Sequence, residues 1–285
     1  MSAEILSDHE LSIEVFRGAQ AICATSETSC VDYHYLRPLL RRIGAVTSLF
    51  SHQGFYSQSI AEALSVANES RVAISGTADY SWFLPGSPLL AELGRLSKDS
   101  IVSVVDGCST PVLSSKRLAV AVPGLHLNAF SQDIRDQLGS KDQDIIVTDA
   151  FLTQFSNKKD RLKILQSWSS ALRLGGLALT TVQIQPPEKS VNKPGSMETF
   201  IKNVTGMFNQ SEYPKALNVS SAGFSDMVYR YAVATHSRVY DSESELIEEI
   251  ELSGLQLLDV SPLTYYSKAS ERTLVYRGLV IQKKS

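Results

Sequence analysis

Small and acidic residues of the kind that bind ligands follow or precede a series of apolar segments in this chain. Gly76 follows the first segment, and Asp106 ends the second. A glycine lets the backbone approach a ligand closely, and a carboxylate can accept hydrogen bonds from two neighbouring hydroxyl groups. Asp133 follows the third segment, Asp149 ends the fourth, and a Gly175–Gly176 pair precedes the fifth. This order favours a ligand site built from successive segment ends.

The elements that must position these residues are apolar runs that alternate with helical stretches. The runs cover residues 71–74, 100–105, 126–130, 144–148 and 177–182. The helical stretches between them cover residues 89–96, 116–122 and 159–174. Continuous apolar strands that alternate with helices predict a parallel sheet covered on both faces. Such a sheet binds ligands beyond the carboxyl ends of its strands, so the polar residues should gather at one edge.

The rest of the chain suggests four regions. Residues 1–68 read as an N-terminal helical cap, and residues 69–184 as the ligand-binding core. Residues 185–240 begin with a proline-rich loop and continue as a helical insert that covers the substrate. Residues 241–285 supply a closing helix and two strands, the last antiparallel. We therefore expect an α/β, Rossmann-like, mostly parallel sheet with helices on both faces and an N-terminal helical lid.

Composition excludes several classes of protein. Of the 285 residues, 43% are hydrophobic and 20% charged, so the chain can bury a core. The formal charge of −3 argues against nucleic acid as a partner, and the Arg41–Arg42 pair reads as a solvated helix face. No apolar window approaches a membrane span, and the N-terminus does not resemble a signal peptide. Cys23, Cys30 and Cys108 lack metal-ligand spacing, so we expect a cytoplasmic protein without a metal site.

The order of these motifs resembles the class I S-adenosylmethionine-dependent methyltransferases. The resemblance runs from about residue 72 to residue 182, and residues 243–282 fit the closing elements of that family. It implies S-adenosylmethionine as cofactor, no metal, and a small-molecule substrate. Gly76 stands in the family's glycine-rich loop. Ala78 and Tyr80 stand where further glycines are usual, and Ile74 stands where an acid is common.

The resemblance also implies cofactor contacts. Gly76, Thr77 and Ala78 would contact the methionine part, and Asp79 would take its ammonium group. Asp106 would accept the ribose hydroxyls, while Asp133 would accept the amine of adenine. The other predicted cofactor contacts are Gly107, Cys108, Ile134 and Thr148. Structural alternatives remain open: an ordinary turn at Gly76, a turn cap at Asp106, and a helix N-cap at Asp133.

Residues near the transferred group are predicted at the fourth segment end and in the N-terminal region. Asp149 and Tyr35 are the catalytic candidates, and Tyr33 and Phe151 the substrate-binding ones. Aromatic rings attract a desolvated sulfonium cation. The alternatives are helix packing for the tyrosines and a core position for Phe151. No general base stands out among the scattered histidines His34, His52, His126 and His236.

Three functions are compatible with this sequence. The first is methylation of a small organic molecule, in specialised metabolism. The second uses the same cofactor without methyl transfer: its own amine attacks the aminobutyrate carbon, which gives azetidine-2-carboxylate and methylthioadenosine. The third is a non-catalytic binding module that kept the fold. Nicotinamide-dependent redox chemistry is a weaker rival, because the three-glycine fingerprint is absent.

Overall fold

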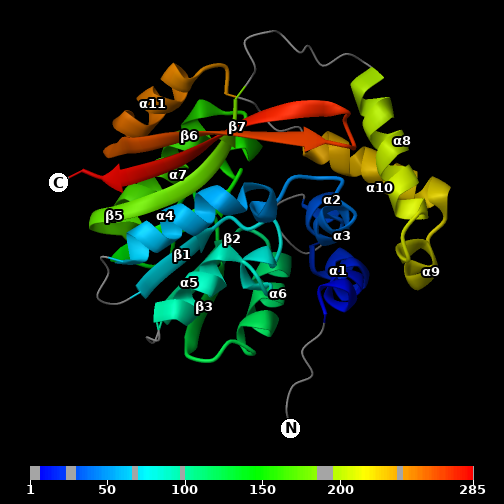
Figure 1. Cartoon of the computed structure of the whole chain (residues 1–285), viewed down its shortest axis with the longest axis horizontal. Helices are drawn as coiled ribbons and strands as arrows, with labels where there is room; N and C mark the ends of the chain where they lie inside the picture. Colours follow the sequence, from blue (N-terminus) through cyan, green and yellow to red (C-terminus); the bar gives the residue numbers. More distant parts are fainter. Residues whose placement is uncertain are drawn as a thin grey trace.

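A single seven-stranded sheet organises the protein (Figure 1). The computed structural model describes residues 7–23, 30–65, 70–96, 100–184, 195–235 and 240–284. The strands are β1 (Ser70–Ser75), β2 (Ser100–Asp106), β3 (Leu125–Ser131), β4 (Gln143–Asp149), β5 (Leu172–Gln183), β6 (Leu255–Ser267) and β7 (Arg272–Lys283). Their order is β3-β2-β1-β4-β5-β7-β6, and β7 runs antiparallel to both of its neighbours. The predicted fold class is confirmed.

Helices cover both faces of the sheet because its central strands are apolar on both sides. Val72 and Ile74 of β1 belong to the hydrophobic cluster that includes α4 (Gln53–Ser65) and α5 (Pro88–Leu96). Ala73, between them, belongs to the opposite cluster. That second cluster contains residues of α7 (Lys158–Ala171) and α11 (Glu243–Leu252). The continuous apolar run in the sequence therefore reflects burial on two faces.

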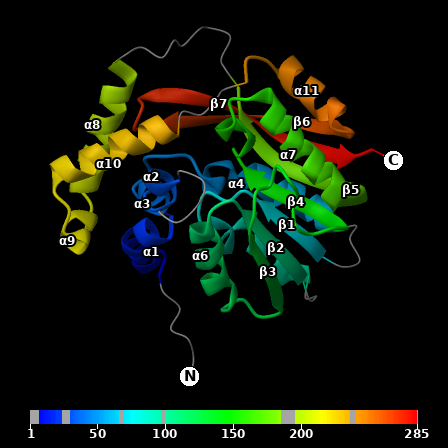
Figure 2. The same cartoon turned by 180° about the vertical axis from the view of Figure 1, so that it is seen from behind.

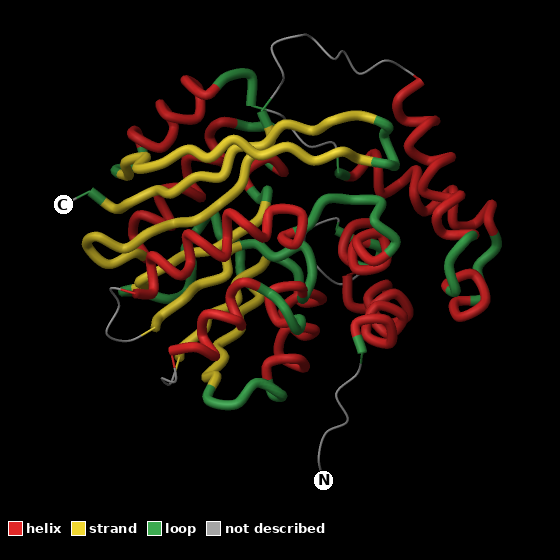
Figure 3. The backbone as a smooth tube through the Cα atoms, in the orientation of Figure 1, coloured by secondary structure: helices red, strands yellow, loops and turns green. Residues whose placement is uncertain are grey.

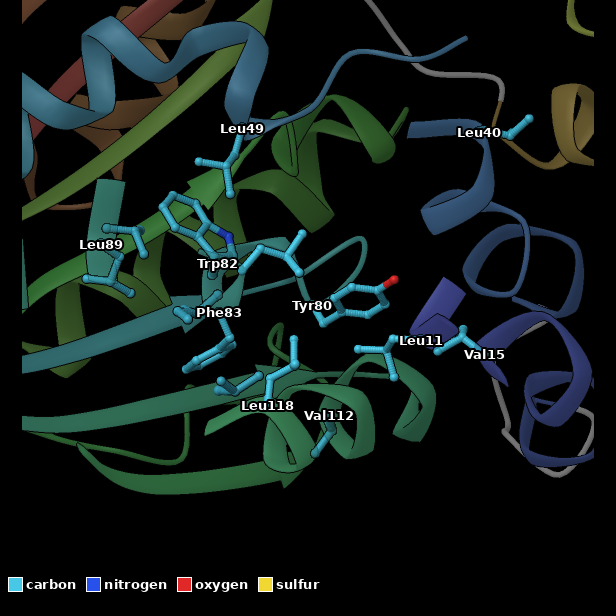
Figure 4. Packing of buried hydrophobic residues seen from close by; sticks show 14 of the residues in the cluster. Leu11, Val15, Leu40, Leu49, Tyr80, Trp82, Phe83, Leu89, Val112 and Leu118 are labelled. Atoms are coloured by element: carbon cyan, nitrogen blue, oxygen red, sulfur yellow. The ribbon is translucent and has the colours of Figure 1, made fainter. Parts of the chain in front are cut away.

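The N-terminal helices approach the sheet from its side. They are α1 (Asp8–Cys23), α2 (Val31–His34) and α3 (Arg37–Arg42), followed by a 3-10 turn, η1 (Leu49–His52). In Figure 4, Leu11 of α1 lies next to Tyr80, and Val112 and Leu118 of α6 (Ser109–Ala119) are part of the same core. Residues 31–42 form two short helices, α2 and α3, and not one continuous helix. α4 packs on β4 and β5, so it belongs to the helix layer of the sheet.

Helices from residues 195–235 pack beside the N-terminal helices. They are α8 (Gly195–Asn209), α9 (Tyr213–Leu217) and α10 (Ser221–Ala234), and both views show them next to α1–α3 (Figures 1 and 2). Tyr213 and Ser12 share a hydrogen bond of 2.7 Å. Figure 3 shows the long β6–β7 pair reaching toward α8, where Asn203 donates a hydrogen bond to the carbonyl of Ala269. These segments together cover one end of the sheet.

One local difference from the sequence analysis concerns β5. Gly175 and Gly176 lie inside β5, not before it. Gly175 has a φ of +74°, and a Cβ at Gly176 would lie 2.8 Å from the carbonyl oxygen of Gln143, so the glycines permit the shift in register beside β4. Among the described residues, no helix has the length and apolar character needed to span a membrane.

Candidate functional site

A cavity of about 320 Å³ opens at the carboxyl ends of β1, β2 and β4. Of the residues predicted from the sequence, it is lined by Tyr33, Gly76, Thr77, Ala78, Asp106, Gly107, Cys108, Asp133, Ile134, Asp149 and Phe151. Lining residues that the sequence analysis did not assign to the site are Cys30, His34, Arg135, Ala150, Gln154 and Phe155. We call this space the first cavity. Its position is the edge at which a parallel sheet of this kind binds ligands.

The turn after β1 requires a glycine. Gly76 has a φ of +66°, and a Cβ there would lie 2.3 Å from the ring of Phe151. The Gly76 amide donates to the carbonyl of Val105, and the Thr148 hydroxyl donates to the carbonyl of Gly76. The turn is therefore fixed by neighbouring strands, and Phe151 packs directly on its backbone.

Asp106 is held rigidly at the end of β2. Its two carboxylate oxygens accept backbone N–H groups of Thr77, at 2.9 Å, and Cys108, at 2.8 Å. Burial raises the pKa of Asp106, and His34, with Nε2 3.8 Å from the carboxylate, partly offsets that effect. Each carboxylate oxygen can accept a further hydrogen bond. Asp106 can therefore bind hydroxyl groups in the first cavity without moving.

His34 is fixed beside Asp106. Its Nδ1 lies 3.1 Å from the carbonyl oxygen of Ala78, which can only accept, so Nδ1 carries the proton and donates. Cys30, His34 and Cys108 bring one potential metal-ligand atom each to within 4.8 Å of one another. Cysteine and histidine are ligands that zinc prefers, a set that sequence spacing did not reveal because the two cysteines lie on separate elements.

Asp133 lies at the wall of the first cavity with its carboxylate already engaged. The Arg135 guanidinium donates to both of its oxygens, at distances of 2.6 to 3.0 Å. The hydrogen bonds from Arg135 lower the pKa of Asp133. An adenine amine would therefore share this carboxylate with Arg135, and the adenine role of Asp133 stays a prediction.

Asp149 ends β4 and carries a hydrogen-bonded network. Its Oδ1 accepts from Thr181 at 2.7 Å, from Tyr56 at 3.2 Å, and lies 2.9 Å from Nδ1 of His52. Burial alone would raise the pKa of Asp149, but His52 and Thr181 hold it below its ordinary value. The next residue, Ala150, has a φ of +53°, which is unusual for a residue with a side chain. Such backbone strain is common where a site must hold a fixed geometry.

Three predicted residues lie outside the first cavity. Asp79 is 4% exposed and accepts from Arg41 at 2.7 Å and from the Ser81 amide at 2.8 Å. Tyr35 is 1% exposed, in the hydrophobic core. Thr148 is fully buried and supports the Gly76 turn.

The interpretation of the Arg41–Arg42 pair as a solvated face is wrong for Arg41. Its side chain is 7% exposed, and its guanidinium also donates to Asp8. The sequence places Arg41 on a helix, but only the fold brings two carboxylates to it.

A second cavity, of about 180 Å³, adjoins the first. Tyr33, Asp149, Ala150 and Gln154 line both. The second cavity is closed by residues from distant parts of the chain, namely Arg37, Thr47, Phe200, Tyr231, Arg272 and Tyr276. Phe200 and Tyr231 lie in residues 185–240, which were predicted to cover the substrate. The other four were not predicted as site residues. In the sequence, Arg37 closely follows a cluster of polar and aromatic residues at positions 32–35. This proximity was the sequence signal that could have pointed to Arg37 as a site residue.

Comparison with known proteins identifies the fold. No protein-family model and no curated protein match the sequence. Among solved structures, a possible exported protein from Bordetella parapertussis has a TM-score of 0.54 and 12% identity over 100% of this chain and 99% of that chain. Burkholderia thailandensis 1,6-didemethyltoxoflavin-N1-methyltransferase, solved with its substrate and S-adenosylhomocysteine, has a TM-score of 0.52 and 13% identity over 100% and 94%.

Magnesium protoporphyrin IX methyltransferase from Synechocystis PCC 6803, with bound S-adenosylhomocysteine, also has a TM-score of 0.52, with 14% identity over 90% of this chain and 100% of that chain. The chain spans 46% of the length of LepI, a likeness with a TM-score of 0.48. The chain therefore has the class I S-adenosylmethionine-dependent methyltransferase fold.

Proposed function

We propose that the protein is a cytoplasmic enzyme of specialised metabolism that transfers a methyl group from S-adenosylmethionine to a small organic molecule. The observation that carries the proposal is the meeting of two cavities at Asp149 and Ala150. A methyl transferase needs such an arrangement, because cofactor and acceptor must approach each other in line and in a fixed orientation.

The residues of the first cavity fit the cofactor. Its volume lies within the range of about 300–1,000 Å³ that small-molecule sites occupy. Asp106 offers a fixed carboxylate for ribose hydroxyls, while Ile134 and Phe155 provide apolar surface for a base. The Gly76 turn exposes backbone to the cavity in a conformation that a glycine adopts readily. These residues would bind the nucleoside part.

The chemistry that the bound cofactor supplies is a methyl group on a positively charged sulfur. The chain's own residues position and desolvate the reactants. Tyr33 lines both cavities and can place an aromatic face near a cation. Oδ1 of Asp149 is held by its neighbours, and within the described residues no donor bonds to Oδ2. Oδ2 can therefore accept a hydrogen bond from the hydroxyl or amine of an acceptor and orient it toward the first cavity.

One observation favours a second candidate, the cyclase. Asp79, expected to take the ammonium group of the methionine tail, is instead paired with Arg41. An amine that lacks this carboxylate partner loses its proton more readily, which is what attack on its own aminobutyrate carbon requires. The carbon–sulfur bond would break with its electron pair on sulfur, and the products would be azetidine-2-carboxylate, methylthioadenosine and a proton.

Incubation with S-adenosylmethionine alone separates these functions. Methylthioadenosine that forms without an acceptor, at a rate above the uncatalysed one, supports cyclisation. S-adenosylhomocysteine that forms only when an acceptor is added supports methyl transfer. Titration calorimetry with S-adenosylhomocysteine tests the third function, because a protein that binds no nucleoside is a module that lost the cofactor.

The variant Asp106→Ala tests the assignment of the first cavity. Loss of a charged acceptor for two hydroxyl groups should weaken S-adenosylhomocysteine binding by about 2–4 kcal/mol. Asp226→Ala, which removes an exposed carboxylate on α10, serves as the matched control and should bind as the wild type does. Equal affinity in both variants would remove the ribose assignment.

A further inference from the structure

The second cavity contains a half-buried positive charge that no carboxylate of the described residues contacts directly. Arg37 lies at the start of α3 and lines this cavity. Its guanidinium donates to the Tyr231 hydroxyl, at 3.2 Å, and to the backbone carbonyl of Thr47. Both acceptors are uncharged. Within the described ranges, no carboxylate lies at ion-pair distance from Arg37, and Asp79 and Asp149 act on its charge only from farther away.

The contacts of Arg37 also fix its orientation. Tyr33 stacks parallel to Tyr231, with ring centroids 5.7 Å apart, and the Arg37 guanidinium lies 6.0 Å from the centre of the Tyr33 ring. The guanidinium is therefore held by Tyr33 of α2 and by Tyr231 of α10. A planar guanidinium held in this way, with N–H donors left over, matches the geometry of a carboxylate ligand.

A second guanidinium reinforces the charge. Arg272, at the first position of β7, lines the same cavity, and in the described part of the chain it has no ion pair with a carboxylate. Asp149 is the one acidic residue among the lining residues that the structure describes. Its Oδ1 is already engaged by His52, Tyr56 and Thr181. The balance of formal charge at the cavity wall is therefore positive.

The remaining wall is largely aromatic. Tyr33, Tyr231, Tyr276 and Phe200 all line the cavity. Burial raises the pKa of Tyr276 to about 12, so its hydroxyl stays protonated and uncharged at neutral pH. Aromatic side chains around two guanidinium groups form a surface on which the ring of an aromatic ligand with one acidic group can pack.

We propose that the second cavity binds a small aromatic carboxylic acid, whose carboxylate is held by Arg37 and Arg272. The identification of this acid as the methyl acceptor rests on the proposed function. The carboxylate anchors the ligand and does not react. Its contact with the arginines places the aromatic ring against Asp149 and Ala150, at the boundary with the first cavity. Another carboxylate, that of the cofactor's methionine tail, has the same chemistry, and the experiment below distinguishes the two sources.

The probes are benzoate, 4-hydroxybenzoate and phenylacetate, each compared with its uncharged amide. Binding is measured by titration calorimetry on the full chain, in the presence and absence of S-adenosylhomocysteine. At least one acid should bind the wild type at least tenfold more tightly than its amide. Arg37→Met should remove at least tenfold of that affinity, and Arg37→Lys should lose less because it keeps the charge. Arg95→Met removes an arginine that is 60% exposed and should change nothing.

Two results would overturn the proposal. One is that no acid binds better than its amide. The other is that Arg37→Met and Arg37→Lys, both folded by circular dichroism, bind the acid as the wild type does.

S-adenosylhomocysteine and methylthioadenosine identify the source of the carboxylate, because only the former carries the amino acid. If Arg37→Met weakens S-adenosylhomocysteine alone and leaves the acids unaffected, the guanidinium binds the cofactor and the acceptor assignment is wrong. If the wild type binds the acids but neither nucleoside, the carboxylate site stands and the proposed methyl transfer fails.

Discussion

Two arginines on one short helix have opposite surroundings. Arg41, at the side of α3 that faces α1, pairs with Asp8 and Asp79, at 2.6 and 2.7 Å. Arg37, one turn earlier, contacts a tyrosine hydroxyl and a carbonyl oxygen and lines the second cavity. The Arg41 side chain is buried, and Arg37 is half-buried. Arg41 pairs directly with two carboxylates, whereas Arg37 faces a space that a ligand can fill.

The comparison shows how to separate structural from ligand-binding charges in this protein. A charge that the chain pairs with its own carboxylates stabilises the packing of α1 and α3 against the turn after β1. Arg37 has no carboxylate in direct contact, since Asp79 and Asp149 act on it only from farther away, and a bound anion would provide a direct partner. Asp79 and Asp106 differ in the same way, since the pKa of Asp79 is lowered by Arg41 against the effect of burial, whereas burial raises that of Asp106.

The same substitution at both arginines should give the largest contrast. Arg41→Met leaves the buried Asp79 without its partner, so the free energy of unfolding should fall by about 3–5 kcal/mol. Arg37→Met removes a charge that has no carboxylate partner, and the free energy of unfolding should change by less than about 1 kcal/mol. Urea unfolding followed by circular dichroism measures both. Equal losses in the two variants would contradict the distinction.

The loss of folding stability at low pH should also distinguish Arg41 from Arg37. Burial acts to raise the pKa of Asp79, but Arg41 brings it below the ordinary value of 3.8. A lowered pKa contributes stability that is present above the unfolded-state value and is lost as the pH falls through the folded-state value. Wild type and Arg37→Met should therefore lose stability steeply below about pH 4.

In Arg41→Met that loss should be smaller, because Arg41 lowers the pKa of Asp79 most, while the Ser81 amide and Arg37 keep part of the effect. Asp149 and Asp133 keep part of the dependence, since their pKa values are lowered by other neighbours. Thermal unfolding between pH 3 and pH 7 provides the measurement. If Arg41→Met and the wild type lost stability equally steeply at low pH, the pair of Arg41 with Asp79 would not contribute to the pH dependence.

The smallest effect is expected at Arg272, which is exposed at the start of β7. Arg272→Met should leave the free energy of unfolding within about 0.5 kcal/mol of the wild type, as surface substitutions usually do. The affinity for the aromatic carboxylic acid should fall about threefold, because a charge screened by solvent contributes little to binding. A loss as large as that of Arg37→Met would assign the main carboxylate contact to Arg272 instead.

Much of the first cavity could be predicted from the sequence, because its residues follow strands. Gly76, Asp106 and Asp149 each end an apolar run, and parallel strands bring such ends to one edge. That reasoning needs only the order of elements along the chain.

The second cavity could not be predicted, because it depends on how distant elements pack. Arg37 and Arg272 come from opposite ends of the chain, and His52 reaches Asp149 across 97 positions. The sequence also could not separate Arg37 from Arg41. Both are arginines on the same helix, and their difference lies entirely in which other segments approach each of them.

Asp149 and Ala150 form a wall common to both cavities, and the left-handed backbone at Ala150 fixes that wall in place. A molecule on one side therefore supplies part of the surface that a molecule on the other side touches. Occupancy on the two sides is then energetically coupled, and linkage makes this coupling reciprocal. If a bound nucleoside changes the affinity of the second cavity for its ligand by some factor, that ligand changes the affinity of the first cavity for the nucleoside by the same factor.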